Sequence, residues 1–221
     1  MPSKPAFTQV EIILLLTAFA AGTVDVTSFA TLGGVFASAM TGNFALLAYY
    51  VAQSNVRAAM GSVVALCGFV VGCVLGVLQR RSRPQGQALN LLLATEAGLL
   101  LIFAVSSLWS QHVLHGSSEH LRILVLAVAM GVQAIIGQTV SLTTIVFTTT
   151  LTKLVGTIAH SIANGDSLGL KDAKIQSALV LAYLFGALLA GALIVHRVDA
   201  VVLLPLASVA LAFGLHRRAD R

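Results

Sequence analysis

Long apolar runs separated by short polar segments make up most of the chain. Six of these runs have about the 20 residues that an α-helix needs to cross a bilayer. They fall at roughly 11–31, 58–79, 88–108, 122–141, 175–195 and 199–216. The pattern therefore predicts an all-α polytopic membrane protein, with six transmembrane helices in a single domain over residues 1–221.

Two further runs, 35–53 and 142–162, are shorter or more polar than the six spans. The first contains a polar turn, Thr41-Gly42-Asn43, and the second is rich in threonine. We predict that both are broken, re-entrant segments that enter the membrane and return. Because non-helical backbone at membrane depth is tolerated only inside protein or beside a water-filled cavity, we expect function at these segments.

Within each broken segment the residue types favour an extended piece followed by a short helix. Residues 31–39 are small and include glycine, whereas residues 141–150 are dense in β-branched side chains, which favour extended backbone. We expect short helices to begin near Phe44 and Leu151, with their N-termini at the centre, where the partial positive charge favours an anion. The residues expected to cap them are Thr41 or Asn43 in the first segment and Thr148, Thr149 or Thr150 in the second.

The composition excludes a soluble domain, because 57% of the residues are hydrophobic and only 10% are charged. The excess of 13 Lys and Arg over 8 Asp and Glu does not indicate nucleic-acid binding. The basic residues lie between the apolar runs and are not interleaved with aromatic residues. We interpret them as topology signals, because short cytoplasmic loops carry the excess of Lys and Arg.

The distribution of Lys and Arg favours six spans over eight. Six spans place nine basic residues on one side and three on the other, whereas eight spans give eight against four, with Lys153 left out of both counts. The nine are Lys4, Arg80, Arg81, Arg83, Lys171, Lys174, Arg217, Arg218 and Arg221, and the three are Arg57, Arg122 and Arg197. We therefore predict that both termini are cytoplasmic.

The two halves of the chain, about 10–109 and 121–217, resemble each other. GTVDV at Gly22–Val26 parallels GVQAI at Gly131–Ile135, and the glycine-containing stretch 68–72 parallels 186–190. Since each half would contain three spans, the second half enters the membrane from the opposite side. The sequence thus predicts an inverted 3+3 repeat.

Several motifs resemble those of the YoaK-like family of bacterial inner-membrane proteins, which have six spans and no assigned activity. The motifs are Gly22-x-x-Asp25, Gly34-Val35-Phe36, Met40-Thr41-Gly42-Asn43, Gly131-Val132-Gln133 and the threonine-rich stretch 144–152. The resemblance covers nearly the whole chain and implies a location in the bacterial inner membrane. This chain departs from the family pattern at Ala134, where an Asn is usual, and at Thr148–Thr150, where Thr-Gly-Thr is usual.

Three ionisable residues at membrane depth are candidates for a solute or proton pathway. A carboxylate inside a span costs ~2.5 to 3.5 kcal/mol on insertion scales, so Asp25 indicates a pathway, or else a partner for backbone N–H groups of the broken stretch. Glu96, in the middle of the third span, allows the same functional and structural interpretations. Lys153 is expected either to neutralise Asp25 or an anionic solute, or to extend its ammonium group to the interface.

Other residues are weighed between binding and packing. Thr41, Gly42, Asn43, Gln133, Thr148, Thr149 and Thr150 would line the pathway, or serve only as caps. Gly68, Gly72 and Gly76 form a stripe that favours close helix packing. His112, His115 and His120 fit a metal site only loosely, so we expect a solvated loop and neither metal nor cofactor.

The sequence favours a transporter or channel for a small polar or anionic solute, with Asp25 and Glu96 as candidates for proton coupling. The alternative is a non-transporting membrane protein that assists assembly or regulation of a partner. No catalytic motif is present, so we do not expect an enzyme; Asp25, Glu96 or His160 would be the residues of one. Apart from lipid and solute, the apolar outer faces and glycine stripes allow a homodimer.

Overall fold

The fold is all-α and contains the six predicted spans. The computed structural model describes residues 7–81, 83–113, 118–140, 147–164 and 167–219. Six helices within these ranges are long and apolar enough to cross a membrane. They are α1 (Gln9–Thr31), α3 (Val56–Arg81), α4 (Gln85–Val113), α5 (Ser118–Thr139), α7 (Ser167–Val195) and α8 (Leu203–Ala219), the last preceded by the 3-10 helix η1 (Asp199–Val202).

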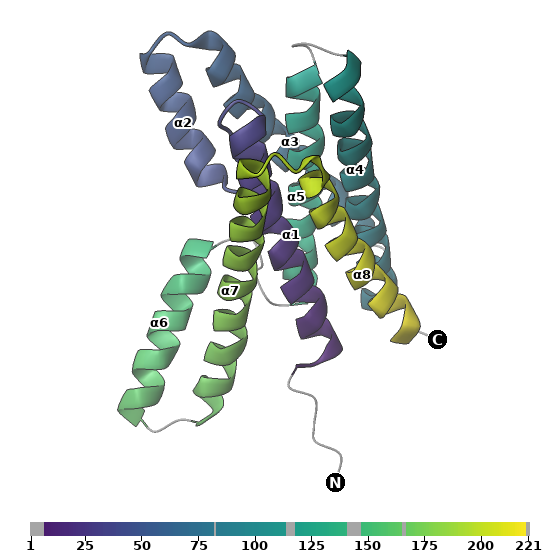
Figure 1. Cartoon of the computed structure of the whole chain (residues 1–221). Helices are drawn as coiled ribbons and strands as arrows, with labels where there is room; N and C mark the ends of the chain where they lie inside the picture. Colours follow the sequence, from purple (N-terminus) through teal and green to yellow (C-terminus); the bar gives the residue numbers. More distant parts are fainter. Residues whose placement is uncertain (1–6, 82, 114–117, 141–146, 165–166, 220–221) are drawn as a thin grey trace.

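Two shorter helices occupy the segments that were predicted to be broken. They are α2 (Met40–Ala52) and α6 (Phe147–Asn164). The 13 residues of α2 extend about 20 Å, which is less than the hydrocarbon core of a bilayer. Each packs on the long helix that follows it, α2 on α3 and α6 on α7, and the two lie in opposite halves of the molecule (Figure 1).

Both predictions about the starts of these short helices need correction. Helix α6 begins at Phe147, four residues before the expected Leu151, so Thr148–Thr150 belong to its first turn. Threonine costs a helix only about 0.7 kcal/mol or less per residue, which the packing against α7 can outweigh. Helix α2 begins at Met40 without a side-chain cap, so the predicted caps were wrong. The remainder of the predicted extended stretch, 141–146, lies outside the described residues.

The core is built from two groups of helices that pack in the same way. Helix α1 packs closely on α7 and α8, and helix α5 packs closely on α3 and α4. Helices α4 and α8 join the two groups, with a smaller contact between α1 and α5. Figure 1 shows α1 and α5 running in opposite directions, since the chain enters α1 at the end of the molecule where it leaves α5.

Glycines allow the closest helix crossings. Gly22 and Gly186 meet where α1 crosses α7, and Gly131 and Gly72 meet where α5 crosses α3. A Cβ atom on any of these four would lie 2.1 to 2.3 Å from a backbone oxygen of the facing helix. The predicted packing role of the glycine stripe on α3 is confirmed. In the comparison of the two halves, the residue of α3 that corresponds to Gly186 of α7 is Gly72. The sequence comparison had paired Gly186 with Gly68, one helical turn earlier.

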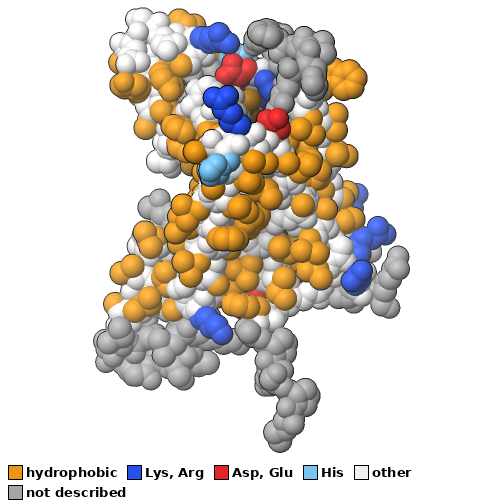
Figure 2. Space-filling view, in the orientation of Figure 1, with side chains coloured by type: hydrophobic (Ala, Val, Ile, Leu, Met, Phe, Trp, Pro, Cys, Tyr) orange, Lys and Arg blue, Asp and Glu red, His pale blue; other side chains and the backbone are white. Residues whose placement is uncertain are grey.

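Charged side chains gather at the two ends of the bundle. Both chain termini lie at one end (Figure 1). The described Lys and Arg side chains at that end are Arg80, Arg81, Arg83, Lys174, Arg217 and Arg218, whereas Arg57, Arg122 and Arg197 lie at the other. Figure 2 shows the middle of one face covered by hydrophobic side chains, with Lys and Arg toward its ends. This distribution is the one that six spans predict.

We expect Gly72→Ala to destabilise the protein by about 1 to 3 kcal/mol, because the new methyl group would overlap the Val128 carbonyl oxygen and force α3 and α5 apart. Gly98→Ala is the matched control, since no atom lies within 4 Å of the position of its Cβ. Thermal unfolding in detergent would measure both variants. Equal stability of the two would contradict the close-crossing interpretation.

Candidate functional site

The connection between α1 and α2, residues 32–39, is non-helical and partly buried. Gly33 and Gly34 have φ angles of +71° and +74°, a left-handed conformation that glycine adopts without strain. They reverse the chain after α1, so that Leu32, Val35 and Ala37 are all buried. Because this backbone is not in a helix, its polar groups need partners other than helical hydrogen bonds.

The buried carboxylate of Asp25 supplies partners to this connection. Its Oδ1 accepts hydrogen bonds from the backbone N–H groups of Ala37 at 3.1 Å and Ser38 at 2.8 Å. Its Oδ2 accepts from the Ser38 hydroxyl at 2.6 Å and from the Tyr183 hydroxyl of α7 at 2.9 Å. Asp25 therefore joins three pieces of the molecule: α1, the connection and α7.

The side chain of Asn43 binds the same connection from the other side. Its Oδ1 accepts from the Phe36 N–H at 2.9 Å and its Nδ2 donates to the Phe36 carbonyl at 2.7 Å. Gly42 leaves room for the Phe36 ring, because a Cβ there would lie 3.1 Å from that ring, which stacks on Phe29. The three first-half motifs thus form one hydrogen-bonded and packed unit.

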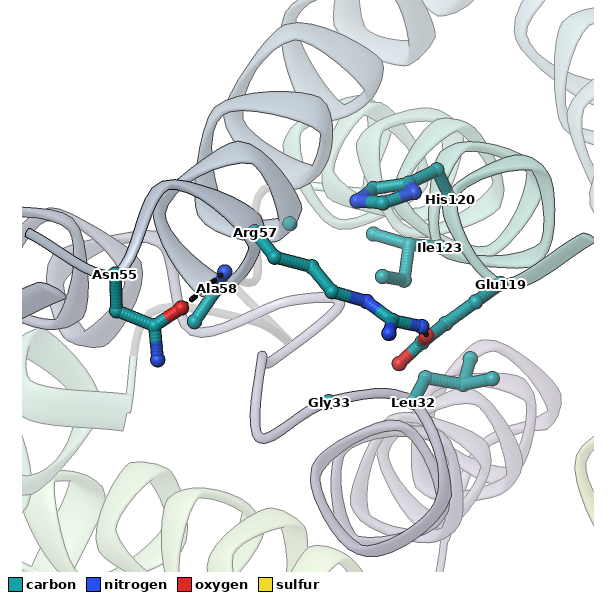
Figure 3. Close-up of a pocket in the computed structure, with 9 residues that line it drawn as sticks. Leu32, Gly33, Asn55, Arg57, Ala58, Glu119, His120 and Ile123 are labelled. Carbon is teal, nitrogen blue, oxygen red and sulfur yellow. Dashed lines mark hydrogen bonds and ion pairs between the residues drawn. The ribbon is translucent and has the colours of Figure 1, made fainter. Parts of the chain in front are cut away.

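A cavity of about 290 Å³ opens beside this unit (Figure 3). Its lining residues come from the ends of α1, α3 and α5 that lie opposite the chain termini in Figure 1. Leu32 and Gly33 form one wall, and the first turns of α3 and α5 form another. Arg57 of α3 and Glu119 of α5 make an ion pair at 3.2 Å across it, with His120 beside them. The Glu119 carboxylate approaches so closely that a Cβ on Gly33 would lie 2.7 Å from its Oε1.

The other predicted residues divide into buried and exposed ones. Gln133 is fully buried and its Nε2 donates to the Thr17 carbonyl of α1 at 2.8 Å. Glu96 is fully buried on α4, and neither carboxylate oxygen has a hydrogen-bond partner. Thr150 is also buried, whereas Thr41 and Lys153 are exposed. The side chains of Thr148, Thr149, His112 and His115 lie outside the described part of the chain.

Sequence reasoning did not find Ser38 and Tyr183, which donate to Asp25, or the pocket residues Arg57 and Glu119. Tyr183 had one usable signal, because it precedes by one helical turn a glycine, Gly186, that packs against α1. Ser38 lies in a stretch of small residues with no distinguishing spacing. Among the described residues, no group of three His, Cys, Asp or Glu side chains is placed to hold a metal ion.

Comparisons with known proteins agree with the sequence motifs. The model of a family described as "Protein of unknown function (DUF1275)" matches residues 13–215, which is most of the chain. The chain belongs to the DUF1275 family. A relative in Bacillus subtilis (strain 168), the UPF0700 transmembrane protein YoaK, is 28% identical over 185 residues, which cover 80% of each chain. No solved structure matches the chain.

Family membership confirms the YoaK-like resemblance and the assignment as a multi-pass membrane protein. The family carries no activity that could be transferred to this chain. Any function for this member therefore has to come from its own residues, above all from the Asp25 unit and the cavity beside it.

We expect Asp25→Ala to speed amide hydrogen exchange across residues 32–40 at least about tenfold. Hydrogen bonds to a charged group contribute about 1.5 to 3 kcal/mol each, and a change of 1.4 kcal/mol is tenfold in an equilibrium. Ser28→Ala is the control, because the Ser28 hydroxyl is buried on the same helix without a hydrogen-bond partner. Mass spectrometry of exchanged peptides measures the effect. Unchanged exchange in Asp25→Ala would show that Asp25 does not hold the connection.

Proposed function

We propose that this protein is a transporter or channel that passes a small polar or anionic solute across the bacterial inner membrane. The observation that carries the proposal is the non-helical connection 32–39, which follows a spanning helix, buries Val35, Ala37 and Ser38, and is bonded to Asp25 and Asn43. Discontinuous helices of this kind are a recurrent feature of secondary transporters, where they form the substrate and ion sites.

The cavity supports a route to that connection. It opens at one end of the bundle, and two residues of the connection, Leu32 and Gly33, line it. Helix α2 begins just beyond the connection, and its first turn has no side-chain acceptor at the N-cap. A helix N-terminus favours an anionic or polarised group. In the cavity itself, Arg57 is paired with Glu119.

The repeated packing supports an inverted 3+3 repeat around the pathway. The first four numbered helices, α1 to α4, correspond in order to the last four, α5 to α8. Under this correspondence, the contacts of α1 with α7 and α8 match those of α5 with α3 and α4. The contact of α2 with α3 likewise becomes that of α6 with α7. The basic residues at the end that holds both termini favour a cytoplasmic location for that end.

One observation favours the alternative function, a membrane protein that assists assembly or regulation of a partner. All four hydrogen bonds that Asp25 accepts come from the protein itself. A carboxylate with this many internal donors serves structure without any solute. Under this alternative the connection 32–39 is a packing feature, and loss of Asp25 impairs folding or partner association.

Flux into sealed proteoliposomes tests the two functions. We expect uptake of at least one member of a panel of small anions and weak acids under an imposed pH gradient. In Asp25→Asn that flux should fall at least about tenfold, because the neutral amide lacks the charge that strengthens all four hydrogen bonds to the carboxylate. Such a loss corresponds to about 1.4 kcal/mol or more.

Asp199→Asn is the matched control, since Asp199 is an exposed acid at the end of the bundle. Its flux should equal that of the wild type. Thermal unfolding should show that both variants remain folded. If wild-type protein passes none of the solutes, and Asp25→Asn instead loses stability, the assembly or regulatory function is favoured.

A further inference from the structure

We infer that Glu96, together with the Gln133 amide oxygen, forms a proton-binding site in the interior of the bundle, separate from the Asp25 unit. The inference rests on the proposed function for its role in coupling, but the site itself can be tested without transport. It assigns the coupling proton to Glu96 alone, whereas the sequence left it between Asp25 and Glu96.

Hydrogen bonds between helices define a buried polar layer that contains Glu96. The Thr17 carbonyl accepts from Gln133 of α5 at 2.8 Å, and the adjacent Leu16 carbonyl accepts from Ser208 of α8 at 2.8 Å. These bonds put α1, α5 and α8 at a common level. Thr17, Gln133 and Ser208 are all buried there.

The position of α4 in this layer follows from a bond at its first turn. His216 of α8 bonds the Gly86 carbonyl of α4 at 3.1 Å. Ser208 lies eight residues before His216 on α8. Because α4 and α8 are antiparallel, the α4 residue at the same height as Ser208 is eight residues after Gly86, at position 94. Glu96 lies two residues beyond that point, or about 3 Å along the helix axis.

A direct bond between α4 and α5 gives a second measure. Gln85 of α4 donates to the Thr139 carbonyl of α5 at 3.0 Å, which puts Glu96 five residues, about 8 Å, beyond the level of Gln133. Helical side chains lean toward the N-terminus of their own helix. Because the two helices are antiparallel, Glu96 leans toward Gln133 and Gln133 leans toward Glu96.

Three side-chain oxygen atoms of this layer lack hydrogen donors. Both carboxylate oxygens of Glu96 and the Oε1 atom of Gln133 are buried without a hydrogen-bond partner. An ionised carboxylate and an amide oxygen are both acceptors, so they cannot satisfy each other. One proton on Glu96 supplies the missing donor, because the carboxyl O–H can donate to Gln133 Oε1.

Asp25 has the opposite environment. Two N–H groups and two hydroxyl groups donate to its four lone-pair positions, an arrangement that suits the ionised carboxylate. Protonation of Asp25 would displace one of these donors, whereas protonation of Glu96 displaces none. The two buried acids therefore differ in which of them gains hydrogen bonds from a proton.

On the described helices that pack against α4, the other ionisable groups lie away from this level. Helices α3, α5 and α8 and the short helix η1 pack against α4. Their charged or titratable side chains lie at the helix ends, apart from two cysteines of α3: Arg57, Cys67, Cys73, Arg80 and Arg81 on α3, Glu119, His120 and Arg122 on α5, Asp199 on η1, and His216, Arg217 and Arg218 on α8. Cys73 lies six residues, about 9 Å, before Gln79, which bonds Thr95 beside Glu96.

A proton satisfies this site better than a metal cation. Hard cations such as Ca²⁺ and Mg²⁺ take about six or more oxygen ligands, and the layer offers three unpartnered oxygens. Uptake of one proton from water converts the Glu96 carboxylate to a neutral carboxyl group. Its release to water restores the carboxylate, so one proton moves for each cycle.

Infrared difference spectroscopy of the full-length protein in lipid nanodiscs, over a range of pH, tests the site directly. We expect the C=O band of a protonated carboxyl group in the wild type and in Asp25→Asn, and its loss in Glu96→Gln. Glutamine conserves the size of the side chain and its N–H₂ can donate to Gln133 Oε1. Retention of the whole band in folded Glu96→Gln, or its loss in Asp25→Asn, would overturn the inference.

Gln133→Met supplies a second measure that keeps Glu96 in place. Methionine has nearly the shape of glutamine but lacks its amide oxygen, so the carboxyl band should persist and shift to higher frequency. An unshifted band would overturn the assignment of Gln133 as the partner, even if Glu96→Gln failed to fold.

Proteoliposome flux then separates this inference from the proposed function. If the wild type transports a solute in a way that depends on the pH gradient, Glu96→Gln should lose that dependence. If the wild type transports nothing while the carboxyl band responds as expected, the proton site stands and the proposed function fails. A flux in Glu96→Gln that still follows the pH gradient would overturn the coupling role.

Discussion

A buried carboxylate that binds backbone N–H groups determines the first half of this structure. A break in a helix within a bilayer leaves N–H and C=O groups that each cost several kcal/mol when unpaired. Asp25 satisfies the N–H groups of Ala37 and Ser38, and Asn43 satisfies both backbone groups of Phe36. Without these bonds, the reversal at Gly33 and Gly34 that returns α2 against α3 would leave these backbone groups without the side-chain partners that they have here.

The parts of the fold that sequence reasoning found depend on local composition. Apolar length gave the six spans, the ends at which the described Lys and Arg side chains lie agreed with six spans, and glycine spacing on α3 indicated a close helix crossing. The motif residues Asp25, Gly42 and Asn43 were found because polar residues and glycines are unusual at membrane depth. Each of these signals is contained within one segment of the chain.

What the sequence could not provide depends on contacts between distant segments. Tyr183 is 158 residues from Asp25, and only the crossing of α1 and α7 brings its hydroxyl within 2.9 Å. Arg57 and Glu119, 62 residues apart, form their ion pair because α3 and α5 begin at the same end of the bundle. The start of α6 was missed because β-branched propensity is weak against tertiary packing. Asn43 was predicted to be a helix cap. Its actual bonds to Phe36 form only after the chain has reversed, and the local sequence does not show that reversal.

The two halves share packing but not chemistry, and this difference divides the roles of the two buried acids. Asp25 lies three residues after the crossing glycine of α1, and the residue three after the crossing glycine of α5 is Ala134. Tyr183 lies three residues before the crossing glycine of α7, and the residue three before that of α3 is Phe69. The neighbouring Gln133 instead bonds Thr17 of α1, eight residues or about 12 Å along the helix from Asp25. Helix α1 therefore bonds to both the Asp25 unit and the layer that contains Glu96. If Glu96 binds the coupling proton and a solute binds beside the connection 32–39, α1 is the helix that links the two sites, because no other described helix holds both sets of hydrogen bonds.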